Sequence, residues 1–131
     1  MGSPPSAPRV LVVDDDPAIV RLLEVNFRLE GFEVDATTRG ERAVELARAA
    51  PPDAVVLDVM MPGLDGWEVC RRLRDEAGLA GVPIVFLSAR PRDVDPERGY
   101  ASGVVAQVTK PFEPLELVAL VRRAIEDARR G

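Results

Sequence analysis

A short apolar run that ends abruptly in an aspartate constrains the fold of this chain more than any other feature. Residues 54–57 read Ala-Val-Val-Leu, Asp58 follows directly, and Pro62-Gly63 marks a loop shortly afterwards. Such a run, bounded by turn residues, is typical of a strand that is buried on both faces of a parallel sheet. Upstream, residues 10–13 end in the same way, in the three aspartates 14–16. Ionisable groups at the ends of buried strands are costly unless function requires them there.

The remaining apolar stretches extend this pattern along the chain. We expect five strands, over residues 9–13, 32–36, 54–58, 83–88 and 104–108. Stretches with helical spacing alternate with them, and we expect five helices, which begin near Pro17, Thr38, Asp65, Pro96 and Pro114. This alternation predicts an α/β fold in which right-handed crossovers build a doubly wound parallel sheet covered on both faces.

Three helix starts carry capping signals. Asp16 followed by Pro17 fits an N-cap with proline in the first turn. Thr38 with Glu41 fits a capping box, and an aspartate at position 65, three residues before a glutamate, fits a similar arrangement. We therefore interpret the aspartates at 16 and 65 as caps rather than as functional groups.

Length, net charge and the counts of histidine and cysteine exclude several classes of function. The 131 residues suffice for one domain, which we place at 9–131 after a Gly/Ser/Pro-rich tail over 1–8 that we expect to be disordered. The net charge of −5 argues against direct binding of nucleic acid, and no apolar run approaches membrane-spanning length. The absence of histidine excludes Ser–His or Cys–His catalysis and histidine-ligated metals. A single cysteine, Cys70, fits a reducing compartment, and we expect a cytoplasmic protein.

In a parallel sheet the carboxyl ends of the strands share one edge, where ligands bind. The polar residues at these ends are Asp14, Asp15, Asp58, Ser88 and Lys110. Asp15 and Asp58 suit direct ligation of Mg²⁺, with Asp14 acting through water. Asp58 is placed to attack phosphorus and form an acyl phosphate, Lys110 to pair with a phosphate oxygen, and Ser88 to donate a hydrogen bond to another.

Four stretches carry a family resemblance: residues 12–17, 57–66, 86–89 and 109–112. They read VVDDDP, LDVMMPGLDG, FLSA and TKPF, in that order. On these motifs the chain resembles a receiver domain of two-component response regulators over about residues 10–128. The resemblance implies a flavodoxin-like fold with strand order 2-1-3-4-5.

The resemblance also implies roles for individual residues. Asp58 would accept a phosphoryl group from a partner histidine kinase or phosphotransfer protein, which makes the chain a switch rather than an enzyme. Ser88 would be the switch hydroxyl, and Lys110, followed by a cis peptide to Pro111, the phosphate-binding lysine. The implied Mg²⁺ ligands are the side chains of Asp14, Asp15 and Asp58 and the backbone carbonyl of Met60.

The sequence departs from the family pattern near its end. Where receivers usually carry an aromatic residue that swings inward on activation, this chain has Gln107, and Val105 and Ala106 replace a familiar acidic pair. The face formed by the fourth helix, the fifth strand and the last helix is where many relatives dimerise or meet partners. A phosphorylation-dependent homodimer, or an effector domain or protein, is the expected readout.

Two alternatives remain open from the sequence. A phosphate-independent interaction module would retain the fold but not the chemistry. A phosphohydrolase with an aspartyl-phosphate intermediate would place an acid–base aspartate two residues after the nucleophile, where this chain has Met60. No effector domain follows Gly131, so we expect a stand-alone receiver or one excised from a longer regulator.

Overall fold

A parallel sheet of five strands forms the centre of the molecule in the computed structural model, which describes residues 7–90, 95, 97–98 and 103–131. The strands are β1 (Arg9–Val13), β2 (Glu33–Thr37), β3 (Ala54–Asp58), β4 (Ile84–Ser88) and β5 (Val104–Thr109). They pair in the order β2-β1-β3-β4-β5, and every neighbouring pair is parallel. The expected fold class and strand order are therefore confirmed.

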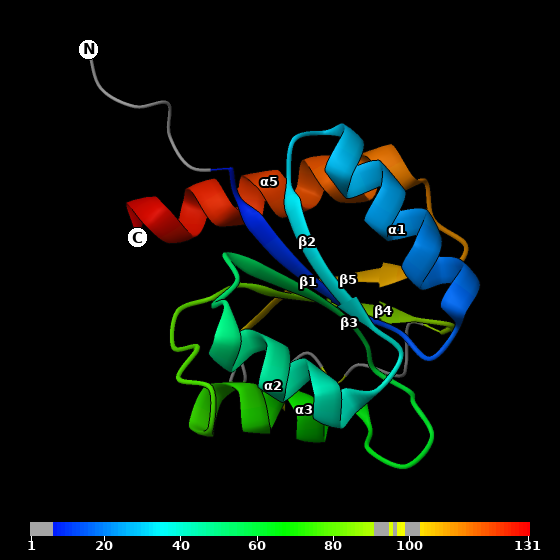
Figure 1. Ribbon diagram of the computed structural model, residues 1–131, viewed down its shortest axis with the longest axis vertical. Coiled ribbons are helices and arrows are strands. Elements are labelled where there is room, and N and C mark those ends of the chain that lie inside the picture. The colour runs from blue at the N-terminus through cyan, green and yellow to red at the C-terminus, as the bar shows by residue number, and fades with distance from the viewer. Residues whose placement is uncertain (1–6, 91–94, 96, 99–102) are drawn as a thin grey trace.

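Helices cover both faces of this sheet. The helices are α1 (Pro17–Leu29), α2 (Gly40–Ala49), α3 (Gly66–Asp75) and α5 (Pro114–Arg130). Figure 1 shows α1 and α5 on one face and α2 and α3 on the other. The described residues thus contain four helices where five were expected. The fifth was predicted at 96–102, and most of that range lies outside the described residues; residues 97 and 98 are described, and both are helical.

The apolar strands are explained by burial on both sides. Successive strand residues point to opposite faces. In β3, Val55 and Leu57 pack with the residues of α2 and α3, whereas Val56 packs with those of α1 and α5. Every residue of β3 and β4 is buried, so these strands read as continuous apolar runs rather than as alternating ones.

Two of the three predicted helix caps are confirmed. The Asp16 carboxylate accepts a hydrogen bond from Ala18 N at 2.9 Å, and Asp65 accepts one from Glu68 N at 2.9 Å. Both are side-chain caps that satisfy otherwise unpaired amides in the first helical turn. Asp16 and Asp65 therefore set where α1 and α3 begin.

The capping box predicted at Thr38 and Glu41 is wrong. Helix α2 begins at Gly40, its N-cap is Arg39, and no side chain caps it. Packing favours glycine at this start, because a Cβ at position 40 would lie only 2.7 Å from Val69 Cγ2 in α3. The first residue of α2 therefore lies against α3, two residues after the predicted cap.

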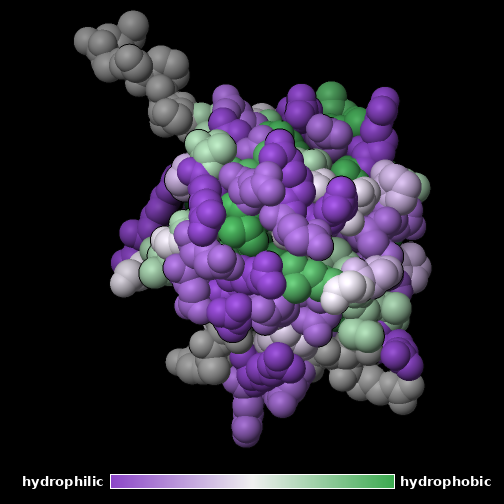
Figure 2. All heavy atoms as spheres, turned by 60° about the horizontal axis from the view of Figure 1, so that its bottom comes forward, coloured by the Kyte–Doolittle hydropathy of each residue, from purple (hydrophilic) through white to green (hydrophobic). Residues whose placement is uncertain are grey.

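The surface over α2 and α3 is mostly hydrophilic (Figure 2). Arginine–carboxylate pairs lie on it, for example Arg42–Glu45 at 2.7 Å and Arg71–Glu68 at 2.7 Å. Exposed pairs of this kind contribute little to stability, so this is a solvated face. Within the described ranges, no helix combines the length and the apolar character needed to cross a bilayer.

Candidate functional site

Three aspartates meet at the carboxyl end of the sheet. Strands β1 and β3 are neighbours, Asp14 and Asp15 follow β1, and Asp58 ends β3. One carboxylate oxygen from each of the three lies within 4.8 Å of the others. Asp14 is fully buried and Asp58 is 4% exposed, whereas Asp15 faces solvent. The sequence predicted that these aspartates lie side by side, and the structure brings them together.

Backbone amides fix the two buried carboxylates. Asp14 Oδ1 accepts a hydrogen bond from Asp16 N at 2.9 Å, and Asp58 Oδ1 accepts one from Met60 N at 3.1 Å. Each contact joins a side chain to the amide two residues later, the Asx turn typical of aspartate where a strand gives way to a loop. The turn holds one oxygen of each carboxylate and leaves the other directed toward the shared site.

Lys110 lies between the two buried carboxylates. Its Nζ is 2.9 Å from Asp14 Oδ2 and donates to Asp58 Oδ2 at 3.3 Å. Lys110 N donates to Ser88 O at 2.8 Å, which ties the end of β5 to β4, and the predicted cis peptide to Pro111 is present. Although burial lowers the pKa of Lys110, the hydrogen bond and charge of Asp14 and those of Asp58 outweigh it and raise this pKa.

The electrostatics of the site make Asp58 reluctant to ionise. Burial raises the pKa of Asp58 from 3.8 to about 6, helped by its side-chain contact with Asp15 and by the negative charge of Asp14. The Met60 amide and the Lys110 ammonium act in the opposite direction but do not offset the rise in this pKa. A single ammonium therefore does not neutralise this acidic cluster.

The cluster fits a hard divalent cation. Asp14 Oδ2 is buried, and the Lys110 ammonium lies 2.9 Å from it, so one cation already contacts this oxygen. The Asp14 carboxylate converges with those of Asp15 and Asp58, and oxygen donors of this kind suit Mg²⁺. The residues that would hold the ion are Asp14, Asp15 and Asp58. The Met60 carbonyl as a further ligand remains a prediction.

Mg²⁺ should stabilise the protein against urea, and this effect should depend on Asp15. Because Asp15 is exposed, Asp15→Asn should leave the free energy of unfolding without metal nearly unchanged. It should weaken Mg²⁺ binding by roughly tenfold, since one charged ligand is lost. Urea titrations with and without Mg²⁺ measure both quantities. The matched control is Asp16→Asn, which keeps a good N-cap. Equal Mg²⁺ affinity in both variants would contradict the proposed ligand set.

Ser88 lies at the same edge of the sheet as this cluster, but its hydroxyl points toward the loop after β4. It is fully buried, and its Oγ donates to the backbone carbonyl of Arg90 at 2.8 Å. The Gln107 side-chain amide donates to the same hydroxyl at 3.0 Å. The structure thus places Ser88 at the predicted edge without a hydrogen bond to Asp58 in the described residues. Sequence reasoning identified Gln107 as unusual but did not predict its contact with Ser88.

A second signal in the sequence was also missed. Lys110 is the only lysine of the chain, whose 17 basic residues are otherwise arginines. Lysine presents a compact ammonium, whereas arginine presents a wide planar fork. A chain that uses arginine everywhere else and lysine at one strand end indicates that this position requires the smaller cation.

Comparison with known proteins agrees with this geometry. Residues 10–122 match the response regulator receiver domain family. The DNA-binding response regulator MtrA of Mycolicibacterium smegmatis is 46% identical over 114 residues, which are 87% of this chain and 49% of that protein. The phosphate regulon transcriptional regulatory protein PhoB of Rhizobium meliloti is 40% identical over 122 residues, 93% of this chain and 54% of that protein. The chain therefore spans about half the length of these relatives.

The fold agrees with solved receiver structures as well. A CheY-like response regulator receiver domain from Methanospirillum hungatei JF-1 superimposes with a TM-score of 0.85 over 95% of this chain and 98% of that chain. At 19% sequence identity, that likeness concerns the fold alone. Together with the match over most of the sequence, it leads to one conclusion: this chain belongs to the receiver domain family of two-component response regulators.

Proposed function

We propose that the chain is a phosphorylation-controlled switch in which Asp58 is the phosphoacceptor. An Asp58 carboxylate oxygen attacks the phosphorus of a phosphohistidine on a histidine kinase or phosphotransfer protein. The new O–P bond forms as the N–P bond breaks, and the histidine nitrogen keeps the electron pair and takes up a proton. The observation that carries this proposal is the position of Asp58, nearly buried between two further aspartates and one ammonium.

The neighbouring residues would stabilise the product by charge and position. Lys110 already contacts Asp58 Oδ2 and would pair with a phosphoryl oxygen. Ser88 would donate its hydroxyl proton to another such oxygen after leaving the Arg90 carbonyl. Bound Mg²⁺ would supply positive charge to the carboxylates of Asp14, Asp15 and Asp58 and to the transferred group. Phosphorylation then shifts a pre-existing equilibrium between two states of the domain.

The output belongs to a separate surface or a separate protein. MtrA is named as a DNA-binding response regulator, but the chain matches only 49% of it. The net charge of −5 supports a domain that does not bind nucleic acid directly. We propose an effector domain or protein as the partner, in the cytoplasm, and a phosphorylation-dependent homodimer through the face that includes β5 and α5.

Acetyl phosphate provides a test that needs no kinase. The wild-type protein should incorporate phosphate in the presence of Mg²⁺ and not with a chelator, and Asp58→Asn should abolish incorporation because the nucleophilic oxygen is lost. Intact mass spectrometry gives the stoichiometry. The matched control is Asp65→Asn, which preserves a capping side chain that is not part of the three-aspartate cluster. Equal incorporation by Asp58→Asn would overturn the assignment of Asp58, and rapid hydrolysis of varied phosphomonoesters would favour an enzyme instead.

A further inference from the structure

An irregularity in β5 determines which side of the sheet Gln107 occupies. Ile84 pairs with Val104, but Val85 pairs with Ala106, so Val105 is an extra residue in β5. A shift of one residue moves every later side chain to the opposite face. Beyond the bulge Gln107 pairs with Phe86, and the two side chains share a face of the sheet.

The same face carries the switch hydroxyl. Ser88 follows Phe86 by two residues in β4, so both project to one side of the strand. Without the bulge Gln107 would project to the other side, toward α1 and α5, where Ala106 and Val108 now pack. Val105 itself is 57% exposed and lies outside this arrangement. The bulge thus brings the side-chain amide of Gln107 to Ser88.

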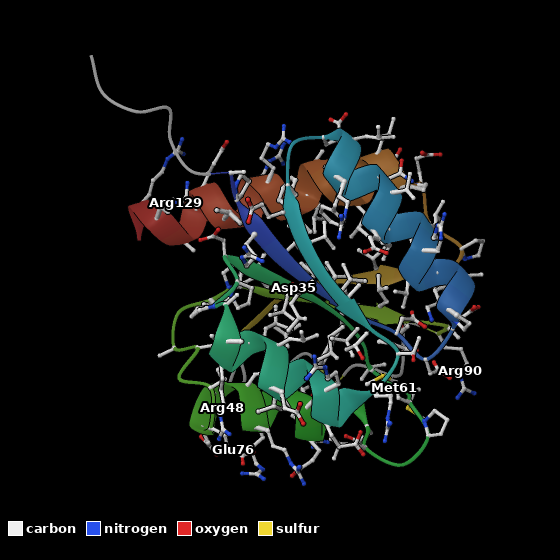
Figure 3. The ribbon with its side chains drawn as sticks, viewed as in Figure 1. Asp35, Arg48, Met61, Glu76, Arg90 and Arg129 are labelled. Carbon is white, nitrogen blue, oxygen red and sulfur yellow. The ribbon has the colours of Figure 1, made fainter. Side chains whose placement is uncertain are left out.

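Three polar groups are joined by hydrogen bonds at this place: Gln107, Ser88 and the Arg90 carbonyl. Gln107 Nε2 donates to Ser88 Oγ at 3.0 Å and to the Arg90 carbonyl at 3.4 Å. Ser88 Oγ donates its own proton to the same carbonyl at 2.8 Å. A carbonyl oxygen only accepts, so the side of the Gln107 amide that faces Arg90 must be its NH₂ group. Arg90 lies in the loop after β4, at the end of the sheet opposite Arg129 (Figure 3).

We propose that Gln107 is a positioning residue that latches Ser88 in its unphosphorylated orientation. This inference rests on the proposed function and concerns how the same site is regulated. A serine hydroxyl has one proton, so Ser88 cannot donate to the Arg90 carbonyl and to a phosphoryl group at the same time. The Gln107 amide bridges the two oxygens that must then separate. It therefore stabilises the state in which Ser88 is unavailable to the phosphoryl group.

Gln107 holds Ser88 through hydrogen bonds of its amide rather than through the volume of its side chain. Burial strengthens its effect, because Ser88 is fully buried and Gln107 is half-buried, so water competes poorly for these groups. Removing the amide should release Ser88 from its contact with Gln107. The Ser88 proton keeps its present acceptor until a phosphoryl oxygen replaces it.

The test measures the affinity for beryllium trifluoride, an acyl-phosphate mimic, at saturating Mg²⁺. Gln107→Met removes the amide at nearly constant size, and Gln107→Asn keeps an amide that is one methylene too short. Both variants should bind the mimic roughly three- to tenfold more tightly than the wild type, the range expected for one or two net hydrogen bonds. Arg42→Met, an exposed change in α2, should bind like the wild type.

A double-mutant cycle with Ser88→Ala separates a latch from a general packing effect. If Gln107 acts through the hydroxyl, Gln107→Met should leave the affinity unchanged when Ser88 is already alanine. The same gain in both backgrounds, or no gain or a loss in the wild-type background, would overturn the latch while Asp58-dependent phosphate uptake persisted. A wild type that neither binds the mimic nor takes phosphate from acetyl phosphate would overturn the proposed function and the latch together.

Discussion

Replacing Lys110 with methionine should lower the free energy of unfolding of the metal-free protein by about 3 kcal/mol at neutral pH, because it leaves buried carboxylates without their counter-charge. The ammonium lies 2.9 Å from Asp14 Oδ2 and 3.3 Å from Asp58 Oδ2, and Asp14 is fully buried. Methionine fills similar space, so lost packing contributes little. The expected loss is therefore electrostatic.

Two dependences distinguish this explanation from a general weakening of the fold. Saturating Mg²⁺ should restore much of the lost stability, since a cation bound by the same carboxylates replaces the missing charge. Acidification through the raised pKa of Asp58, about 6, should also narrow the gap in stability between variant and wild type, because a protonated Asp58 needs no cationic partner. Urea unfolding between pH 5 and 8, with Mg²⁺ or a chelator, measures both. Arg42→Met, which removes an exposed ion pair, is the control and should change stability by less than about 1 kcal/mol. If the loss in free energy of unfolding were the same with and without Mg²⁺ and at every pH, the electrostatic explanation would be wrong.

Asp58→Asn should have the opposite effect and stabilise the metal-free protein at pH 7.5. The pKa of Asp58 rises from 3.8 to about 6 on folding, mainly through burial. A rise of this kind means that the folded state holds the proton more tightly than the unfolded state. The stability linked to this proton is complete below pH 3.8 and is lost as pH rises through about 6. At 1.36 kcal/mol per pKa unit, the loss amounts to at most about 3 kcal/mol.

The neutral amide of asparagine avoids that loss. Asp58→Asn should therefore unfold at higher urea concentration than the wild type at pH 7.5 in chelator, by about 2 kcal/mol, and the difference should shrink toward pH 4. The measurement is a set of urea titrations across this pH range, with Asp65→Asn as a control that should not vary in this way. A variant less stable than the wild type at pH 7.5 would show that the ionised carboxylate contributes more through its contacts with Lys110 and Met60 than burial costs it.

Elements whose signals are local were predictable from the sequence. The bounds of β1 and β3 agree with those expected, because both strands are apolar and buried, and an aspartate marks the end of each: Asp14 follows β1 and Asp58 ends β3. Strand β2 was placed one residue too early, at 32–36 instead of Glu33–Thr37. It is an edge strand with a mixed burial pattern, so its ends carry a weaker hydrophobic signal.

Features that depend on distant contacts were not predictable. Helix α2 begins where the backbone of Gly40 fits against Val69, a contact that local capping residues do not report. The bulge at Val105 shifts the register of β5, and no residue of this strand is of a type that would predict a bulge there. The same distinction applies to the candidate site. Its carboxylates and Lys110 were predictable because they lie at strand ends. The contact of the Gln107 amide with Ser88 was not, because it depends on the register of β5.

The ammonium that bridges Asp14 and Asp58 also makes this protein simple to observe. Since Lys110 is the sole lysine and its side chain is 21% exposed, reductive methylation with isotope-enriched formaldehyde places one side-chain label, at the centre of the acidic cluster. The amino terminus is the only other group that is methylated. A change in the signal of the Lys110 label therefore reports the electrostatic surroundings of that one nitrogen. The scarcity of lysine thus turns a charge-balancing residue into a built-in spectroscopic reporter.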